Sequence, residues 1–322
     1  MASKSFDDEY YLRFEDAFRG SRAEILERLR IYEPLLSMAS EQGNIIVRGL
    51  DIGCGRGEWL ELCNRKGFKV VGVDLNSCMV DFCLKNGLQA FEAEGKSYLE
   101  GQPDNSLEII SLFHVIEHLN RSRLEGLVLE CLRVLAPSGI LVMETPSSDN
   151  LIVASKGFYA DPTHLRPIHP ETTCFELQYL GFNWANAFYV NGNHSYRDGN
   201  PLGLTSILVG TANDVAIIAQ KQGIKGQLDQ TSSWTSLLRT NETTLQAATR
   251  IDSEHLQKYV TLNERLDRLE SEAQKTINQL ILTQQSLNLA HAKINSLTNS
   301  RIWKATKPLR LLILALKRRA KV

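Results

Sequence analysis

Two carboxylates and three glycines have a spacing that suits a nucleoside with a cationic end. Asp51 precedes Gly53, Gly55 and Gly57 after an apolar run, and Asp74 ends the next run. Alternate glycines let the backbone turn tightly and approach a ligand. An acid beside such a loop repels a pyrophosphate and attracts an ammonium group, whereas an acid ending the second strand can accept hydrogen bonds from both ribose hydroxyls. S-adenosylmethionine, which has no phosphate, fits this description.

Segment 45–190 resembles a class I S-adenosylmethionine-dependent methyltransferase. The glycine loop and Asp74 match the first two motifs of that family, residues 113–119 (FHVIEHL) its fourth-strand motif, and residues 132–139 (LRVLAPSG) the entry to its fifth strand. The resemblance implies an α/β fold with a Rossmann-like, seven-stranded, mostly parallel sheet. It also implies that the cofactor lies across the carboxyl ends of the strands.

The adenine contact departs from that family. Where the family often has Gly-Asp-Ala, this chain has residues 95–97 (GKS), so Glu94 or Ser97 would have to hold the adenine edge. The residues expected to bind the cofactor are Asp51, Gly53, Gly55, Gly57, Asp74, Leu75, Glu94, Ser97 and His114.

Four histidines lie where a base could face the transferred methyl group. Methylation of a hydroxyl requires that the oxygen lose its proton, and a neutral imidazole has a suitable pKa for accepting it. His114 and His118 follow the fourth strand, and His164 and His169 lie in the loop after the fifth. We expect His164 to act as the base, oriented by Asp161, with His118 as the second candidate.

A structural role is the alternative for Glu117 and His118, because neighbours in a strand-to-helix turn often cap the helix or pack. Together with Asp161, His164 and His169 they also offer nitrogen and oxygen ligands to a metal ion. Their spacing matches no compact metal motif, so the sequence predicts no metal.

The N-terminal stretch has apolar residues at helical spacing and predicts one or two helices lying against the sheet domain. Its aromatic residues are Tyr10, Tyr11, Phe14 and Phe18. They could close over the cofactor, with Arg19 or Arg22 meeting its carboxylate, or they could only pack on the sheet.

Short apolar runs alternate with helical patterns from residue 45 to 220, which is typical of strands and crossover helices in a parallel sheet. A helix is expected over 170–180, where Pro170 suits the first turn and Gly181 the end. Residues 191–213, rich in Gly and Asn, indicate an insertion between the last two strands. The predicted strands are 45–52, 69–75, 88–93, 108–113, 139–144, 184–190 and 214–220.

The composition changes after this domain, which is assigned residues 1–222. Residues 223–261 are rich in Gln, Thr, Ser and Asn and predict a polar linker or helical approach. From Leu262 to Leu297, alternate steps of four and three pick out eleven positions, nine of them apolar. This stripe predicts a coiled coil over 262–298, whose number of helices stays open. The alternative is a single amphipathic helix folded back on the globular domain.

The tail, residues 299–322, combines cations with apolar residues. It carries eight Lys or Arg and no acid, although the whole chain has a net charge of -1. Trp303 and the leucines that follow Pro308 fit a helix lying in an anionic membrane interface. A disordered basic tail and a docking peptide for another protein are the alternatives.

The overall composition excludes some classes of protein. The charges nearly balance and so give no basic face for nucleic acid. The six cysteines show no C-x-x-C pairing, no apolar N-terminal signal is present, and the longest apolar run, residues 311–316, is too short to cross a bilayer. We therefore expect a reduced, cytoplasmic protein.

Three further segments are similar to a bacterial subgroup encoded with surface-polysaccharide enzymes and often called O-antigen methyltransferases. They are residues 14–21 (FEDAFRGS), 144–146 (ETP) and 161–167 (DPTHLRP), and residues 299–310 are similar to tails that follow coiled coils in that pathway. This resemblance implies O-methylation of a sugar hydroxyl on a lipid-linked surface polysaccharide, which modifies the O-antigen or terminates its chain.

The expected enzyme lies peripherally at the inner face of the cytoplasmic membrane. It would form a homo-oligomer through the coiled coil, with a glycosyltransferase of the same pathway as a further candidate partner. Two alternatives are a methyltransferase of quinone-like or other small molecules, and a non-catalytic assembly scaffold of the polysaccharide machinery.

Overall fold

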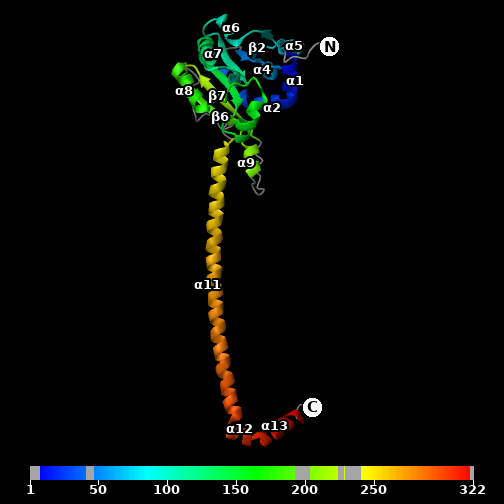
Figure 1. The fold of residues 1–322 in the computed structure, drawn as a ribbon, viewed down its shortest axis with the longest axis vertical. Coiled ribbons are helices and arrows are strands. Elements are labelled where there is room, and N and C mark those ends of the chain that lie inside the picture. The colour runs from blue at the N-terminus through cyan, green and yellow to red at the C-terminus, as the bar shows by residue number, and fades with distance from the viewer. Residues whose placement is uncertain (1–7, 41–46, 193–203, 224–227, 229–240, 320–322) are drawn as a thin grey trace. The chain divides into compact units, whose positions relative to one another are not determined.

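The computed structural model describes residues 8–40, 47–192, 204–223, 228 and 241–319. The chain divides into two compact units, Met1–Arg250 and Ile251–Val322 (Figure 1).

A seven-stranded sheet forms the centre of the first unit, in the order β3-β2-β1-β4-β5-β7-β6. The pairs are parallel except for β7, which runs antiparallel to both β5 and β6. The order reverses between β1 and β4, and ligands of open α/β sheets bind at such a point. The strands are β1 (Arg48–Ile52), β2 (Lys69–Asp74), β3 (Ala90–Glu92), β4 (Leu107–Phe113), β5 (Leu135–Pro146), β6 (Trp184–Val190) and β7 (Asp214–Gln220).

All seven predicted strands and the predicted mostly parallel sheet are confirmed. The fifth strand begins earlier than predicted, because Leu135 pairs with Leu107 ahead of an irregularity in the ladder. The start predicted at Ile45 lies outside the described residues. In the insertion after β6, residues 204–210 form the helix α9, which composition alone did not indicate.

The N-terminal segment forms more helices than predicted. Gly20 has a φ of +105° and interrupts the helix, and the side chains and backbones of Ser21 and Glu24 then cap the next helix reciprocally. These helices are α1 (Asp8–Phe18), α2 (Arg22–Leu29), the 3₁₀ turn η1 (Arg30–Tyr32) and α3 (Glu33–Ser40).

The remaining helices connect the strands. The prediction of a helix over 170–180 is confirmed, with His169 as its N-cap and Gly181 at its end. These helices are α4 (Glu58–Arg65), α5 (Ser77–Lys85), α6 (Gly95–Glu100), η2 (Ile116–His118), α7 (Arg121–Val134), η3 (Val153–Gly157), η4 (Phe158–Ala160), α8 (Pro170–Leu180) and α9 (Leu204–Gly210).

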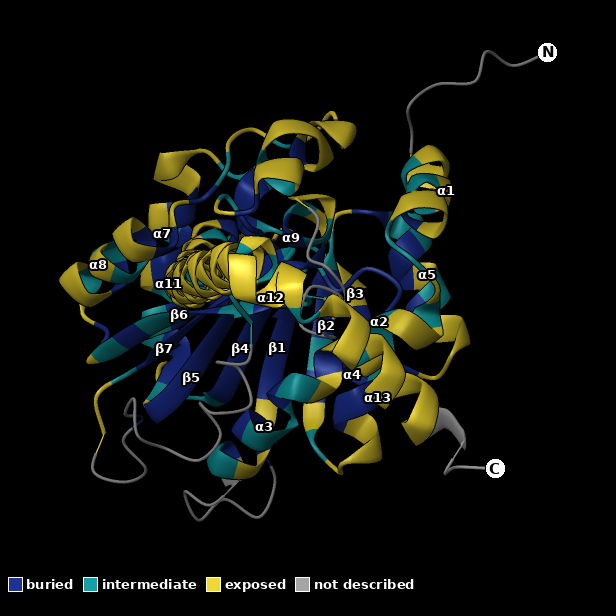
Figure 2. Cartoon of the chain, turned by 90° about the horizontal axis from the view of Figure 1, so that it is seen from below, coloured by how far each residue is buried: buried dark blue, intermediate teal, exposed yellow. Residues whose placement is uncertain are grey.

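The sheet is buried between two hydrophobic clusters, one on each face. One contains Tyr32 and Trp59 from η1 and α4, and the other contains Leu127 and Leu177 from α7 and α8. The central strands β1, β4, β5 and β7 in Figure 2 are accordingly almost entirely buried, whereas the edge strands β3 and β6 are partly exposed. Burying each large apolar side chain stabilises the fold by about 1.5–3 kcal/mol, so the sheet is a rigid platform for the residues at its carboxyl edge.

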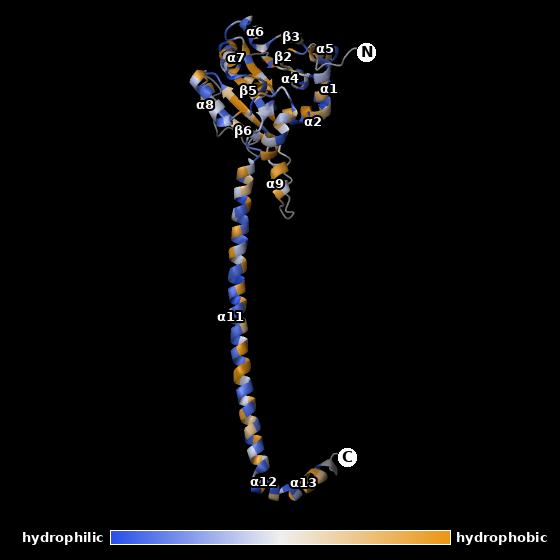
Figure 3. Cartoon of the chain, viewed as in Figure 1, coloured by the Kyte–Doolittle hydropathy of each residue, from blue (hydrophilic) through white to orange (hydrophobic). Residues whose placement is uncertain are grey.

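The second unit consists of helices. It contains most of the long helix α11 (Thr244–Asn299), which begins in the first unit, followed by α12 (Arg301–Ala305) and α13 (Lys307–Arg319). A helix covers all of residues 262–298, the segment predicted as a coiled coil, and it begins already at Thr244 within the segment expected as linker or helical approach. Polar and apolar residues alternate along it (Figure 3), and the leucines of the predicted stripe are exposed. Pro308 lies in the first turn of α13, where its missing backbone N–H costs no hydrogen bond.

None of the described helices combines the length and apolar content that crossing a bilayer requires.

Candidate active site

The glycine loop joins β1 to α4 in a conformation that needs glycine. Gly53, Gly55 and Gly57 all have positive φ, at +69°, +50° and +77°. A Cβ on Gly53 would lie 2.4 Å from Cγ2 of Val115, whereas a Cβ on Gly55 would meet only Oε2 of Glu15, at 3.6 Å. The loop is therefore packed closely at Gly53 and open toward a cavity at Gly55.

Asp51 lies buried beneath this loop. It faces Ser111 of the neighbouring strand β4, whose Oγ donates to Asp51 Oδ1 at 2.6 Å. Burial raises the pKa of Asp51 to about 7, and the hydrogen bond from Ser111 opposes this rise. A cationic group in the loop would stabilise the ionised carboxylate.

Asp74 holds two backbone segments at the end of β2. Its Oδ2 accepts from Gly55 N at 2.9 Å, and its Oδ1 accepts from Asn76 N at 2.8 Å. A carboxylate has further lone pairs, and Asp74 borders the cavity. It can therefore fix the glycine loop and still accept from a ligand, whereas the sequence predicted only the second role.

A cavity of about 420 Å³ opens at the carboxyl ends of β1, β2 and β4. The predicted cofactor residues that line it are Gly53, Gly55, Asp74, Leu75, Glu94 and His114. Asp51 lines an adjoining cavity of about 270 Å³, which shares Gly53, Gly55 and His114 with the first. Most of the predicted set is thus brought together.

Gly57 and Ser97 do not line the described cavities. Gly57 is the N-cap of α4 and packs against Leu88. The N and Oγ of Ser97 donate to Glu94 Oε2 at 2.7 and 3.0 Å at the start of α6. Ser97 therefore positions Glu94, which is the one of the two that faces the cavity.

The N-terminal segment supplies Tyr11 and Arg19, both predicted as candidates to meet the cofactor, and Glu15, which was not predicted. Tyr11, Glu15 and Arg19 all line the 420 Å³ cavity, and Arg19 forms an ion pair with Glu15 at 2.9 Å. Arg22 instead pairs with Glu61 of α4. The spacing of four residues between Tyr11, Glu15 and Arg19 was the signal that they share one helix face.

A third cavity, of about 290 Å³, lies between α1 and the loop after β5. Aromatic Phe14 and Phe18 line it together with His118, Asp161 and His164. It shares Tyr11, Glu15, Arg19, His114 and His118 with the 420 Å³ cavity. The three predicted catalytic residues therefore converge beside the candidate cofactor cavity.

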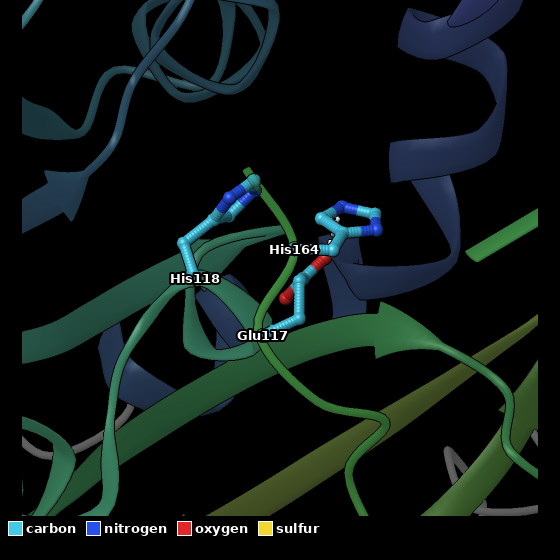
Figure 4. A group of neighbouring side chains, drawn as sticks. All are labelled: Glu117, His118 and His164. Atoms are coloured by element: carbon cyan, nitrogen blue, oxygen red, sulfur yellow. Dashed lines mark ion pairs between the residues drawn. The ribbon is translucent and has the colours of Figure 1, made fainter. Parts of the chain in front are cut away.

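His118 and His164 are neighbours although they are far apart in sequence, with ring centres 4.7 Å apart. Nε2 of His164 lies 3.9 Å from Glu117 Oε1 (Figure 4) and also 3.9 Å from Asp161 Oδ2. His118 belongs to the short turn η2 and lines both cavities, so it does not serve as a helix cap. His169 is exposed and caps α8 outside this group.

A buried ionic network behind the glycine loop was not predicted. His114 has a φ of +57°, and its Nε2 lies 3.4 Å from Glu144 Oε1 and 3.8 Å from Asp214 Oδ1. Burial alone would lower the pKa of His114, but Glu117, Glu144 and Asp214 raise it to about 10. Glu144 also accepts a hydrogen bond from Tyr32. Glu144 was the available sequence signal for this network, because it is an acid within the otherwise apolar strand β5.

The fold and these cavities define a class of protein. A sheet with its last strand reversed, a glycine loop over a buried acid, and a second acid ending β2 form an S-adenosylmethionine-binding α/β enzyme. S-adenosylmethionine fits these cavities. Gly55 leaves room beside the loop, Asp51 would meet the ammonium and Asp74 the ribose. Arg19, a cation that lines both cavities, would meet the carboxylate.

Comparisons with known proteins agree. A family model described as a methyltransferase domain matches residues 16–186, more than half of the chain. A crystal structure of an S-adenosylmethionine-dependent methyltransferase from Archaeoglobus fulgidus is 34% identical, covers 66% of this chain and 100% of its own, and superposes with a TM-score of 0.58. A probable S-adenosylmethionine-dependent methyltransferase from Mycolicibacterium smegmatis is 31% identical over 135 residues.

That alignment covers 41% of this chain and 51% of the mycobacterial protein, so the chain spans about half the length of this curated relative. The chain belongs to the methyltransferase domain family. It is an enzyme, and its cofactor is S-adenosylmethionine.

Proposed function

We propose that this enzyme methylates a sugar hydroxyl of a lipid-linked surface polysaccharide at the cytoplasmic face of the membrane. The observation that carries the proposal is the 290 Å³ cavity, which joins the cofactor cavity and combines aromatic rings with imidazole and carboxylate groups. The long helix and the cationic, apolar tail support an acceptor that is held at a surface.

The aromatic pair suits one face of a sugar ring. The rings of Phe14 and Phe18 lie 4.9 Å apart, and Phe18 is 72% exposed at the cavity. Binding sites for small ligands combine such apolar surfaces with a few polar groups that fix orientation. Asp161, which accepts from Tyr11 at 3.0 Å, is a polar group on the opposite wall.

The methyl transfer requires few catalytic groups from the protein. S-adenosylmethionine supplies a methyl group on a sulfonium sulfur that is already activated for displacement. The chain must align the acceptor oxygen and take up its proton. His164 and His118 face this cavity, and His164 is positioned by its Nδ1, which lies 2.6 Å from the carbonyl oxygen of Phe158.

The acceptor class is tested by incubating the purified chain with radiolabelled cofactor and either the lipid-linked glycan or quinone-like small molecules. We expect label in the glycan and none in the small acceptors. His164→Ala should reduce the rate by about 100-fold or more, and His169→Asn, which keeps a capping side chain on α8, should leave it unchanged. Label in the small acceptors alone would refute the proposed substrate.

The tail has the features of a membrane-surface helix. Leu309, Leu312, Ile313 and Leu316 have the spacing of one helical face and are exposed. The Arg310 guanidinium lies 3.5 Å from the ring centre of Trp303 and donates to its carbonyl oxygen, which ties α13 to α12. Each basic residue near an anionic surface contributes about 1 kcal/mol.

The exposed stripe of α11 supports a homo-oligomer. Leu266, Leu280 and Leu287 are each about half exposed or more, and burying them against a second copy of the chain gives the seam of a coiled coil. Several tails on one oligomer bind a surface far more tightly than one tail does.

Sedimentation with anionic vesicles tests both the membrane-binding tail and the coiled-coil oligomer. The full chain should pellet, and the chain without residues 301–322 should stay in the supernatant. The variant Leu266→Pro with Leu287→Pro should be a monomer by light scattering and pellet at least tenfold more weakly, because avidity is lost. Pelleting that does not depend on residues 301–322 would exclude the tail as the anchor.

A further inference from the structure

We infer that Glu117, His118 and His164 form a binding site for a divalent first-row transition-metal ion at the wall of the acceptor cavity. One ligand atom from each of these three residues can be chosen so that all lie within 4.8 Å of one another. Figure 4 shows the carboxylate of Glu117 and the two imidazoles converging from η2 and from the loop after η4. The site stands on its own contacts, and its catalytic role rests on the proposed function.

The contacts of His164 leave a lone pair on the nitrogen that faces Glu117. Its Nδ1 lies 2.6 Å from the carbonyl oxygen of Phe158, and a carbonyl oxygen can only accept. Nδ1 must therefore carry the proton. In the neutral ring, Nε2 then has a free lone pair, and it is this atom that lies 3.9 Å from Glu117 Oε1.

His118 is held in the same tautomer by a chain of two hydrogen bonds. Thr163 Oγ1 lies 2.5 Å from Asp161 Oδ1, and the carboxylate can only accept, so the hydroxyl proton points at Asp161. The same Oγ1 lies 2.9 Å from His118 Nδ1 and must accept there. Nε2 of His118 is left with its lone pair, as in metal-bound histidines whose other nitrogen donates to an oriented oxygen.

Glu117 supplies the third donor atom. Its side chain is fully buried, and Thr145 Oγ1 donates to Oε2 at 3.0 Å, which fixes the carboxylate. The other oxygen, Oε1, is buried and has no hydrogen-bond partner, with His114 Nδ1 at 3.4 Å as a nearby ion-pair contact. His114 meets this oxygen as an ion pair and not as a hydrogen bond, so Oε1 keeps a lone pair for a bound cation.

The donor set indicates the kind of ion. Two imidazole nitrogens and one carboxylate oxygen suit Zn²⁺, Mn²⁺, Fe²⁺ or Co²⁺, whereas Mg²⁺ prefers oxygen alone. Three protein ligands leave positions open, as in catalytic metal sites. The local spacing of these residues gave no metal motif, because His164 reaches the other two only through the fold.

The other histidine and carboxylate cluster differs in this respect. His114, Glu144 and Asp214 also lie close together. There the two ring nitrogens of His114 face oxygens of Glu117 and Glu144 at 3.4 Å each, as in an ion-paired network. No fixed lone pair of His114 is directed at an open position.

The bound ion would act on the acceptor hydroxyl. A hydroxyl that occupies an open position is acidified and loses its proton to solvent water. The oxygen then provides the electron pair of the new O–C bond, while the pair of the broken C–S bond stays on sulfur. In this arrangement His164 is a ligand, and the metal replaces it as the group that activates the oxygen.

The test is a titration of the chelator-stripped full chain with Co²⁺, whose visible absorption reports imidazole coordination. We expect one Co²⁺ per chain above the background of the other histidines. His118→Gln and His164→Gln should each weaken binding by about 100-fold, and Thr163→Val, which breaks only the chain to Asp161, by about tenfold. His169→Asn is the matched control and should bind like the unaltered chain, and circular dichroism checks the fold of each variant.

Unchanged Co²⁺ affinity in both His118→Gln and His164→Gln would overturn the site, as would the absence of stoichiometric binding in the unaltered chain. Glycan methylation that persists in chelator, without metal binding, overturns the metal and leaves the proposed function with His164 as base. Metal binding without methylation of any glycan leaves the site and overturns the proposed substrate.

Discussion

Replacing Asp74 with alanine is expected to weaken S-adenosylmethionine binding by at least about 100-fold. The change removes the carboxylate proposed to hold the ribose diol, and two hydrogen bonds to a charged group contribute about 3 kcal/mol or more together. It also releases Gly55 N and Asn76 N, which Asp74 holds at 2.9 and 2.8 Å. Isothermal titration calorimetry measures the loss.

The control for this prediction is Asp81→Ala, which removes the same charge from an exposed position of α5. It should leave the affinity unchanged. Both variants should keep the far-ultraviolet circular dichroism of the unaltered chain, because Asp74 lies at the end of a strand and not in the core. Equal affinities for the two variants would refute the ribose role of Asp74.

Replacing Gly53 with alanine is the second change with a large expected effect. The added Cβ would lie 2.4 Å from Cγ2 of Val115, a stiff β-branched side chain, at a φ of +69°. The loop would have to move away from Val115, which follows β4, and this would displace Gly55 and the cavity wall. We expect no measurable cofactor binding.

Gly67→Ala is the matched control, since Gly67 has a φ of +82° and its Cβ would meet nothing within 4 Å. Both variants carry the cost of a left-handed alanine, about 1–2 kcal/mol, and only Gly53→Ala adds the overlap. Thermal unfolding should therefore report a loss of stability in both, whereas calorimetry should report lost binding in one. Normal cofactor affinity in Gly53→Ala would show that the loop tolerates the overlap.

Local patterns were sufficient to predict the sheet, because each strand of this fold is a short apolar run between turn residues. The glycine loop could also be predicted, since its three glycines occupy alternate positions of one short segment, and the structure gives each a positive φ. The helix after Pro170 was predicted because its cap and its end lie within the segment. Features decided by neighbours in sequence were thus recovered.

Contacts between residues that are far apart in the sequence could not be predicted. Thr163 orients His118 across 45 positions of sequence, and Glu144 meets Asn191 across 47. Neither pairing has a local pattern. Ser97 was predicted to bind the cofactor, but its N and Oγ donate to Glu94 and the residue does not line the described cavities.

The position of β7 has a consequence for how the enzyme is made. This strand is inserted between β5 and β6, and among the described strands β6 pairs with β7 alone. While the chain leaves the ribosome, the sixth strand must therefore wait for residues 214–220 before it can pair. Because β7 runs in reverse, its first residue, Asp214, arrives beside His114 at the same moment. A nascent chain that stalls before this point has an open sheet edge and lacks Asp214 in its pocket, so docking of β7 completes the sheet and adds this carboxylate in one event.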